Sequence, residues 1–200
     1  GVHIVAAYDR TRLIEGAIHT LSEVMWHEML IASLAILLIS SFTMRNPSPV
    51  GANLVYWSVV SLIGVGMGAL VWYYARIPDG MLLVAKAFLT TAAAFGGLSL
   101  WGYTTKRDLS AFGTFLIMGV IGLVIASVVN LFIQSSMLSF AISAIGVLVF
   151  AGLVAFDTQR LKNMYYQLGG NERAMSVATT YGALSLYINF INLFQFLLQL

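Results

Sequence analysis

The sequence predicts an all-α fold, a polytopic bundle of membrane-spanning helices. Of the 200 residues, 60% are hydrophobic and only 9% are charged, and the mean hydropathy is +0.89. Soluble domains are usually about a quarter charged, so this chain lacks the polar groups to cover a water-exposed surface. Long charge-free runs separated by turn residues supply the helices, because a helix needs roughly 20 apolar residues to cross the hydrocarbon. We therefore expect a multi-pass integral membrane protein.

Residues 1–27 are predicted to form an atypical amphipathic segment ahead of the bundle domain of residues 28–200. Apolar residues recur there at helical spacing. Charged residues interrupt them at Asp9, Arg10, Arg12, Glu15 and Glu23. Charges inside a span are costly, so a helix lying on the membrane surface fits this pattern better than a crossing.

Six spans follow in the bundle domain. Residues 29–44 end at Arg45 and the helix-breaking sequence NPSP, and residues 52–75 end before Arg76 and Pro78. Residues 81–104 contain one charge, Lys86, close enough to an end to reach the headgroups. The charge-free stretch 109–156 is too long for one crossing, so we divide it at Gln134 into spans 112–133 and 137–156. The sixth span begins at residue 176 or 181 and runs to residue 200.

The distribution of basic residues between alternate loops predicts the orientation. One side has Arg45, Lys106, Arg107, Arg160, Lys162 and Arg173. The other side has only Arg76 and the nearby Lys86. By the positive-inside rule, the first side faces the cytoplasm.

Small residues at spacings typical of close helix packing predict where backbones approach each other. They are Gly64, Gly66, Gly68, Gly96, Gly97, Gly119, Gly122 and Ala126.

A polar stripe follows one face of the sixth span. Its members, at steps of 4, 3, 3 and 4, are Ser185, Asn189, Asn192, Gln195 and Gln199. Polar side chains in hydrocarbon are costly unless they have partners, so we expect this last helix to be central, with the stripe facing polar groups or water. The same pattern also fits hydrogen bonds that only hold helices together.

Asp157 directly follows the fifth span, and no other acid lies between Asp108 and Glu172. In one interpretation it is an interfacial residue that pairs with Arg160. In the other, the fifth helix continues to about residue 165 and holds Asp157 slightly inside the bilayer, beside Arg45 and the sixth helix. A carboxylate there would attract a cation and respond to protonation.

Several function classes are disfavoured. Ten Lys and Arg against eight Asp and Glu, without a basic run, argue against nucleic acid as a partner, and the absence of cysteine excludes thiolate chemistry. The three histidines, His3, His19 and His27, all precede the predicted spans, so none can activate a serine inside the membrane. Their spacing does not suit a metal site, and no second buried carboxylate suggests an aspartyl protease. We expect no enzyme, no metal centre and no cofactor.

Two stretches resemble the bacterial YccA branch of the Bax inhibitor family. They are LWGYTTKRDLS at residues 100–110, and FDTQRLK at 156–162 together with LSLYINFINLF at 184–194. The resemblance covers residues 29–200. It implies an inner-membrane protein with seven transmembrane helices and a central last one. The first of the seven would belong before residue 29, where the charges make the segment unlike a span.

The resemblance also implies a calcium leak pathway, gated by protons at two aspartates on the last two helices, with an arginine as a latch. The first aspartate matches Asp157 and the arginine matches Arg45, but the second falls on Asn189. Two nearby carboxylates raise each other's proton affinity, whereas one beside an amide and an arginine stays ionised to lower pH. We therefore expect a weakened or shifted pH response, with the bilayer and calcium ions as partners. The alternative is an interaction module that modulates membrane proteases or stress and cell-death factors.

Overall fold

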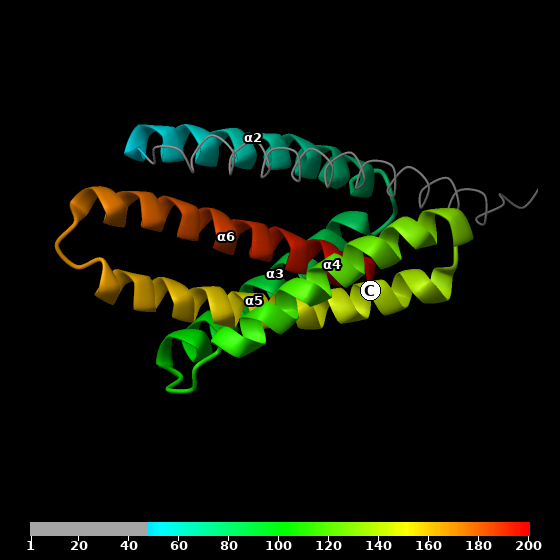
Figure 1. Cartoon of the computed structure of the whole chain (residues 1–200). Coiled ribbons are helices and arrows are strands. Elements are labelled where there is room, and N and C mark those ends of the chain that lie inside the picture. The colour runs from blue at the N-terminus through cyan, green and yellow to red at the C-terminus, as the bar shows by residue number, and fades with distance from the viewer. Residues whose placement is uncertain (1–47) are drawn as a thin grey trace, which may run out of the picture.

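The structure, a computed structural model, describes residues 48–200 and shows five α-helices and no strand in that part of the chain (Figure 1). The helices are α2 (Pro49–Tyr74), α3 (Gly80–Thr104), α4 (Ser110–Ile133), α5 (Ser136–Gln167) and α6 (Glu172–Gln199). All five are long and apolar enough to cross a membrane. They confirm the second to sixth predicted spans. The amphipathic segment 1–27, the predicted span 29–44 and Arg45 lie outside the described residues.

Local sequence signals set the helix ends. Ser48, Ser135 and Asn171 cap the N-termini of α2, α5 and α6, each accepting a hydrogen bond from a backbone N–H three residues on. Gln134 adopts a left-handed conformation (φ 52°), which ends α4 at the predicted division of the long apolar stretch.

Helix α5 extends beyond the apolar span 137–156 and ends at Gln167, close to the end near residue 165 that the second interpretation of Asp157 predicted. Charged residues are unfavourable inside the hydrocarbon, but they do not disrupt an α-helix. Helix α5 therefore continues through Arg160 and Lys162 beyond the apolar run. Similarly, α6 begins at Glu172, earlier than either predicted start.

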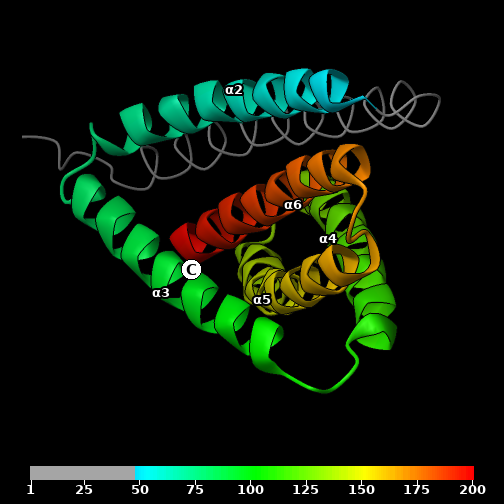
Figure 2. The same cartoon turned by 90° about the vertical axis from the view of Figure 1, so that its left-hand side faces the viewer.

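Helices α5 and α6 form the middle of the described bundle. Helix α6 packs against α2, α3 and α5, and α5 packs against α3, α4 and α6 (Figure 2). Most of the buried side chains belong to these two helices. The expected central position of the last helix is therefore shared with α5.

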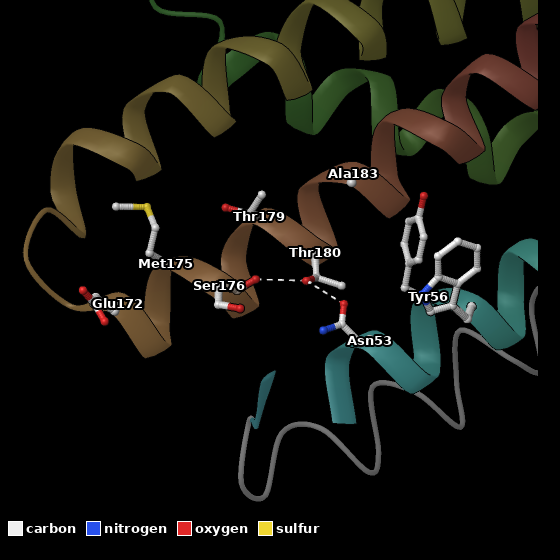
Figure 3. Close-up of a pocket in the computed structure, with 9 residues that line it drawn as sticks. Asn53, Tyr56, Glu172, Met175, Ser176, Thr179, Thr180 and Ala183 are labelled. Atoms are coloured by element: carbon white, nitrogen blue, oxygen red, sulfur yellow. Dashed lines mark hydrogen bonds between the residues drawn. The ribbon is translucent and has the colours of Figure 1, made fainter. Parts of the chain in front are cut away.

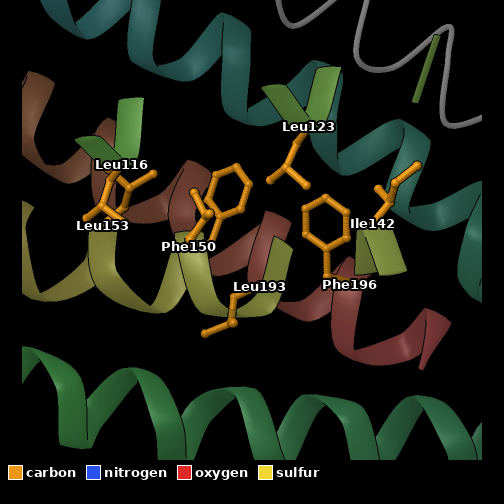
Figure 4. Packing of buried hydrophobic residues seen from close by; sticks show 8 residues of the cluster. Leu116, Leu123, Ile142, Phe150, Leu153, Leu193 and Phe196 are labelled. Atoms are coloured by element: carbon orange, nitrogen blue, oxygen red, sulfur yellow. The ribbon is translucent and has the colours of Figure 1, made fainter. Parts of the chain in front are cut away.

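The largest apolar cluster joins α4, α5 and α6 (Figure 4). Its members are Leu116, Leu123, Ile142, Val149, Phe150, Leu153, Leu193 and Phe196. The rings of Phe150 and Phe196 stack with centroids 5.7 Å apart. The cluster fixes the rotation of α6 against α5, and so determines which residues of α6 face α5 further along.

The prediction of close packing at small residues was wrong at most positions. Within residues 48–200, a Cβ added to Gly64, Gly68, Gly96, Gly97 or Gly122 would meet nothing within 4 Å, whereas one on Gly119 would lie 3.1 Å from Val149. The backbones of α3 and α5 approach each other closely at Gly102, where an added Cβ would lie 2.2 Å from the carbonyl oxygen of Ala155. Spacing identifies a face that could receive a neighbour, but it does not say where the neighbour lies.

Candidate functional site

The carboxylate of Asp157 on α5 points at α6. Its Oδ2 accepts a hydrogen bond from Asn189 Nδ2 at 2.7 Å and a short one from the hydroxyl of Ser185. Asp157 is 7% exposed and Asn189 is 5% exposed. Ser185 and Asn189 are four residues apart, so they lie on successive turns of the same helix face and converge on one oxygen. The result is a buried acid that links the two central helices through neutral donors.

The length of α5 explains the burial of Asp157. The helix continues for ten residues beyond it, from 157 to 167, which is about 15 Å. Arg160, the partner in the interfacial interpretation, is exposed. A surface ion pair between Asp157 and Arg160 does not fit a carboxylate buried against α6, so that interpretation was wrong.

Gln159 connects the same part of α5 to the loop between α3 and α4. It is 6% exposed, its Oε1 accepts from the Leu109 N–H at 2.9 Å, and its Nε2 donates to the Arg107 carbonyl at 2.7 Å. One turn further, Lys162 Nζ donates to the Tyr103 carbonyl at 2.6 Å. These contacts hold the loop against α5, two residues away from Asp157. Sequence analysis missed them, because nothing in the spacing distinguishes Gln159 from a surface glutamine.

The loop itself has an ordered turn at Asp108. Its Oδ1 accepts from the Ser110 hydroxyl at 2.7 Å and from the Ser110 N–H at 2.9 Å. These hydrogen bonds hold the pKa of Asp108 below its ordinary value. The carboxylate also lies at the positive end of the α4 dipole, where a negative charge is favourable.

The remaining members of the polar stripe do not reach Asp157. Asn192 donates to the Ile188 carbonyl of its own helix at 2.8 Å. Gln195 donates to the sulfur of Met67 on α2 at 3.4 Å, and Gln199 accepts from the Ser143 hydroxyl on α5 at 3.1 Å. The contacts of Gln195 and Gln199 match the interpretation in which the stripe holds helices together.

Two buried hydroxyls have no hydrogen-bond partner among the described residues, those of Tyr181 on α6 and Ser99 on α3. Tyr181 precedes Ser185 by four residues and so lies on the face that carries the donors to Asp157. A buried hydroxyl without a partner costs about 1–3 kcal/mol, and such groups in proteins usually bind water or an ion.

Within residues 48–200, no group of three or more His, Asp or Glu residues could hold a metal ion. The structure thus brings together Asp157, Ser185 and Asn189 from the predicted site, and it separates Asn192, Gln195 and Gln199 from them. Arg45, the expected latch, lies outside the described residues.

Comparison with known proteins gives one family. Residues 4–200 match the family model described as "Inhibitor of apoptosis-promoting Bax1". The match therefore extends further towards the N-terminus than the resemblance noted above, which starts at residue 29. A protein of Caulobacter vibrioides is 58% identical over 84% of this chain and 65% of its own length. Protein RP147 of Rickettsia prowazekii is 45% identical over 74% of this chain and 60% of its own length.

The inner membrane protein YbhL of Escherichia coli is 40% identical over 86% of this chain and 72% of its own length. The chain spans less than two thirds of the Caulobacter and Rickettsia relatives. With the five apolar helices, these similarities establish a multi-pass integral protein of the inner membrane.

Proposed function

Because the chain belongs to the Bax inhibitor family of membrane proteins, we propose that it forms a calcium leak pathway that protons regulate where α5 meets α6. The supporting observation is the buried carboxylate of Asp157, held by Ser185 and Asn189. We also propose that the chain belongs to the YccA-like branch, that calcium is cargo and that no catalysis is involved.

The closed state depends on the charge of Asp157. Hydrogen bonds to an ionised carboxylate are roughly twice as strong as bonds between neutral groups. While Asp157 is ionised, its bonds to Ser185 and Asn189 tie α5 to α6. Protonation removes the charge and weakens both bonds, so α5 and α6 can separate. Acidification therefore increases the flux, and the unpartnered hydroxyl of Tyr181 is a suitable place for water beside this opening.

The chemistry of the site suits transit of calcium better than storage. Calcium prefers six to eight oxygen ligands, several of them carboxylates. A single carboxylate with neutral oxygens from Ser185 and Asn189 attracts the ion but holds it weakly. In this proposal Arg45 is the latch that competes with calcium for Asp157.

Asn189 determines how steeply the flux depends on pH. An amide can hydrogen-bond Asp157 but cannot share a proton with it, so only one group of this pair titrates. The substitution Asn189→Asp should steepen the dependence of the calcium flux on pH. An unchanged slope would contradict the assigned role of Asn189.

The direct test measures calcium flux into liposomes as a function of pH. Asp157→Asn should remove the pH dependence and keep the flux at the level that the wild type reaches in acid, because a neutral side chain cannot hold α5 and α6 together as the carboxylate does. Asp79→Asn is the matched control, because Asp79 is exposed in the α2–α3 turn and an asparagine also tolerates its left-handed backbone (φ 60°). A wild-type pH dependence in Asp157→Asn would refute the proposal.

The second candidate is an interaction module that modulates membrane proteases or stress and cell-death factors. Two observations favour it: the family description names an inhibitor that acts on another protein, and Gln195 and Gln199 make only contacts that join helices. Asp157→Ala separates the candidates. A leak pathway loses the pH dependence of its calcium flux, whereas an interaction module retains capture of its partner.

A further inference from the structure

A groove separate from the Asp157 site lies between the first halves of α2 and α6 (Figure 3). Its volume is about 590 Å³, and it is lined mainly by Asn53, Tyr56 and Trp57 of α2 and by Glu172, Ser176 and Thr179 of α6. Both helix halves start at the end of the bundle where the basic loops lie, the side that the positive-inside rule assigns to the cytoplasm.

The residues that line the groove change from charged to polar to aromatic along its length. Glu172 is the first residue of α6 and lies at the outermost end of the groove. Further in, the Thr180 hydroxyl lies 3.0 Å from the Ser176 carbonyl and 3.5 Å from Asn53 Oδ1, so polar groups cross from one helix to the other. Tyr56 follows at the other end of the groove. Its ring centroid lies 5.4 Å from that of Trp57, which also lines the groove.

The order of charged, polar and aromatic groups along the groove matches the order of headgroup and acyl chains in a lipid. Trp57 is 64% exposed, so its ring is accessible to a lipid, and tryptophan is enriched at membrane–water interfaces. From Glu172 to Ala183 the groove follows eleven residues of α6, about 16 Å, which exceeds the length of a small soluble amine or a free phosphate.

We propose that the groove binds a phospholipid with a cationic amine in its headgroup, of the phosphatidylethanolamine type. The amine lies at the carboxylate of Glu172, and the phosphate accepts hydrogen bonds from the hydroxyls of Ser176 and Thr179. The acyl chains leave the groove past Trp57. Among residues 48–200, Glu172 is the only charged residue in the lining, so charge complementarity favours the amine and disfavours a lipid whose headgroup is only anionic. The inference does not depend on calcium conduction.

Lipid retention tests the proposal. The purified full chain is equilibrated in detergent with phosphatidylethanolamine and phosphatidylglycerol that have identical acyl chains, and bound lipids are counted by native mass spectrometry. We expect the wild type to prefer the amine lipid. Glu172→Gln should reduce that preference by up to about fivefold, the effect of an exposed ion pair. Asp79→Asn, which removes an acid at the opposite end of the bundle, should leave it unchanged.

A second variant and a cross-link keep the test decisive. Ser176→Ala should weaken retention of both lipids equally, because it removes a donor to the phosphate that they share. A photoreactive acyl chain on phosphatidylethanolamine should cross-link to the peptide that contains Trp57. Equal retention of the two lipids by the wild type, an unchanged preference in Glu172→Gln, or cross-linking of the photoreactive lipid only to peptides without Trp57 would overturn the proposal.

Discussion

Replacing Gly102 with alanine should push α3 away from α5 beside the Asp157 site. The added Cβ would lie 2.2 Å from the carbonyl oxygen of Ala155 and 2.9 Å from two further backbone atoms of that residue. Real Cβ contacts are almost never shorter than 3.0 Å, so the two helices must separate by at least 3.0 − 2.2 = 0.8 Å. All three atoms belong to the backbone, and therefore no change of rotamer can relieve the clash.

The expected cost is that of overpacking a close contact, about 1–3 kcal/mol. Gly97→Ala is the matched control, because Gly97 lies on the same helix and a Cβ there meets nothing within 4 Å. Alanine favours a helix by up to about 1 kcal/mol over glycine at either position, so the difference between the variants isolates the contact with Ala155.

The assay is unfolding of the full chain in mixed micelles with increasing denaturing detergent, followed by helical circular dichroism. We expect Gly102→Ala to unfold at a lower detergent fraction than the wild type and Gly97→Ala at the same fraction or a higher one. Equal midpoints for the two variants would mean that α3 does not contact α5 at Gly102, and the geometry described for this end of the bundle would be wrong.

Two further predictions concern the loop between α3 and α4. Gln159→Leu leaves the buried Leu109 N–H without its acceptor, which costs about 1–3 kcal/mol, so this amide should exchange hydrogen faster; Gln167→Leu, at an exposed position of the same helix, should not change it. The second concerns the turn at Asp108. The pKa of this group is lowered in the folded protein, so its stabilising effect is full above about pH 4 and is lost as the pH falls through the folded value. The protection of the Ser110 amide, taken relative to its intrinsic exchange rate at each pH, should fall over that acid range in the wild type, and a similar fall in Asp108→Asn would contradict the assignment.

The sequence predicted which segments cross the membrane, because that depends on the length of apolar runs and the position of charges. It left two possible ends for α5, at residue 156 or near residue 165, since a helix that leaves the hydrocarbon can continue through charged residues such as Arg160. Helix ends outside the membrane depend on caps and turns, and Asn171 capping α6 is one that the hydropathy pattern does not reveal.

The contact between Asp157 and Asn189 was predictable, because the polar stripe and the family resemblance both pointed to it. The partners of Gln195 and Gln199 were not, since they depend on the rotation of α6, which the apolar cluster around Phe150 and Phe196 fixes. Gln159 was missed for a different reason. Its partners are backbone atoms of a loop about 50 residues away in sequence, and no side-chain pattern marks them.

The role of Asp157 is tested most directly by the distance between α5 and α6 as a function of pH. The sequence contains no cysteine, so spin labels can be placed specifically at Tyr166→Cys on α5 and Thr179→Cys on α6, two exposed positions. In liposomes, pulsed electron paramagnetic resonance should show longer distances as the pH falls. With Asp157→Asn added, the longer distances should be present at every pH. If the distance between the two spin labels does not change with pH in the protein with Asp157 intact, the proposed closure of the pathway by this carboxylate is wrong.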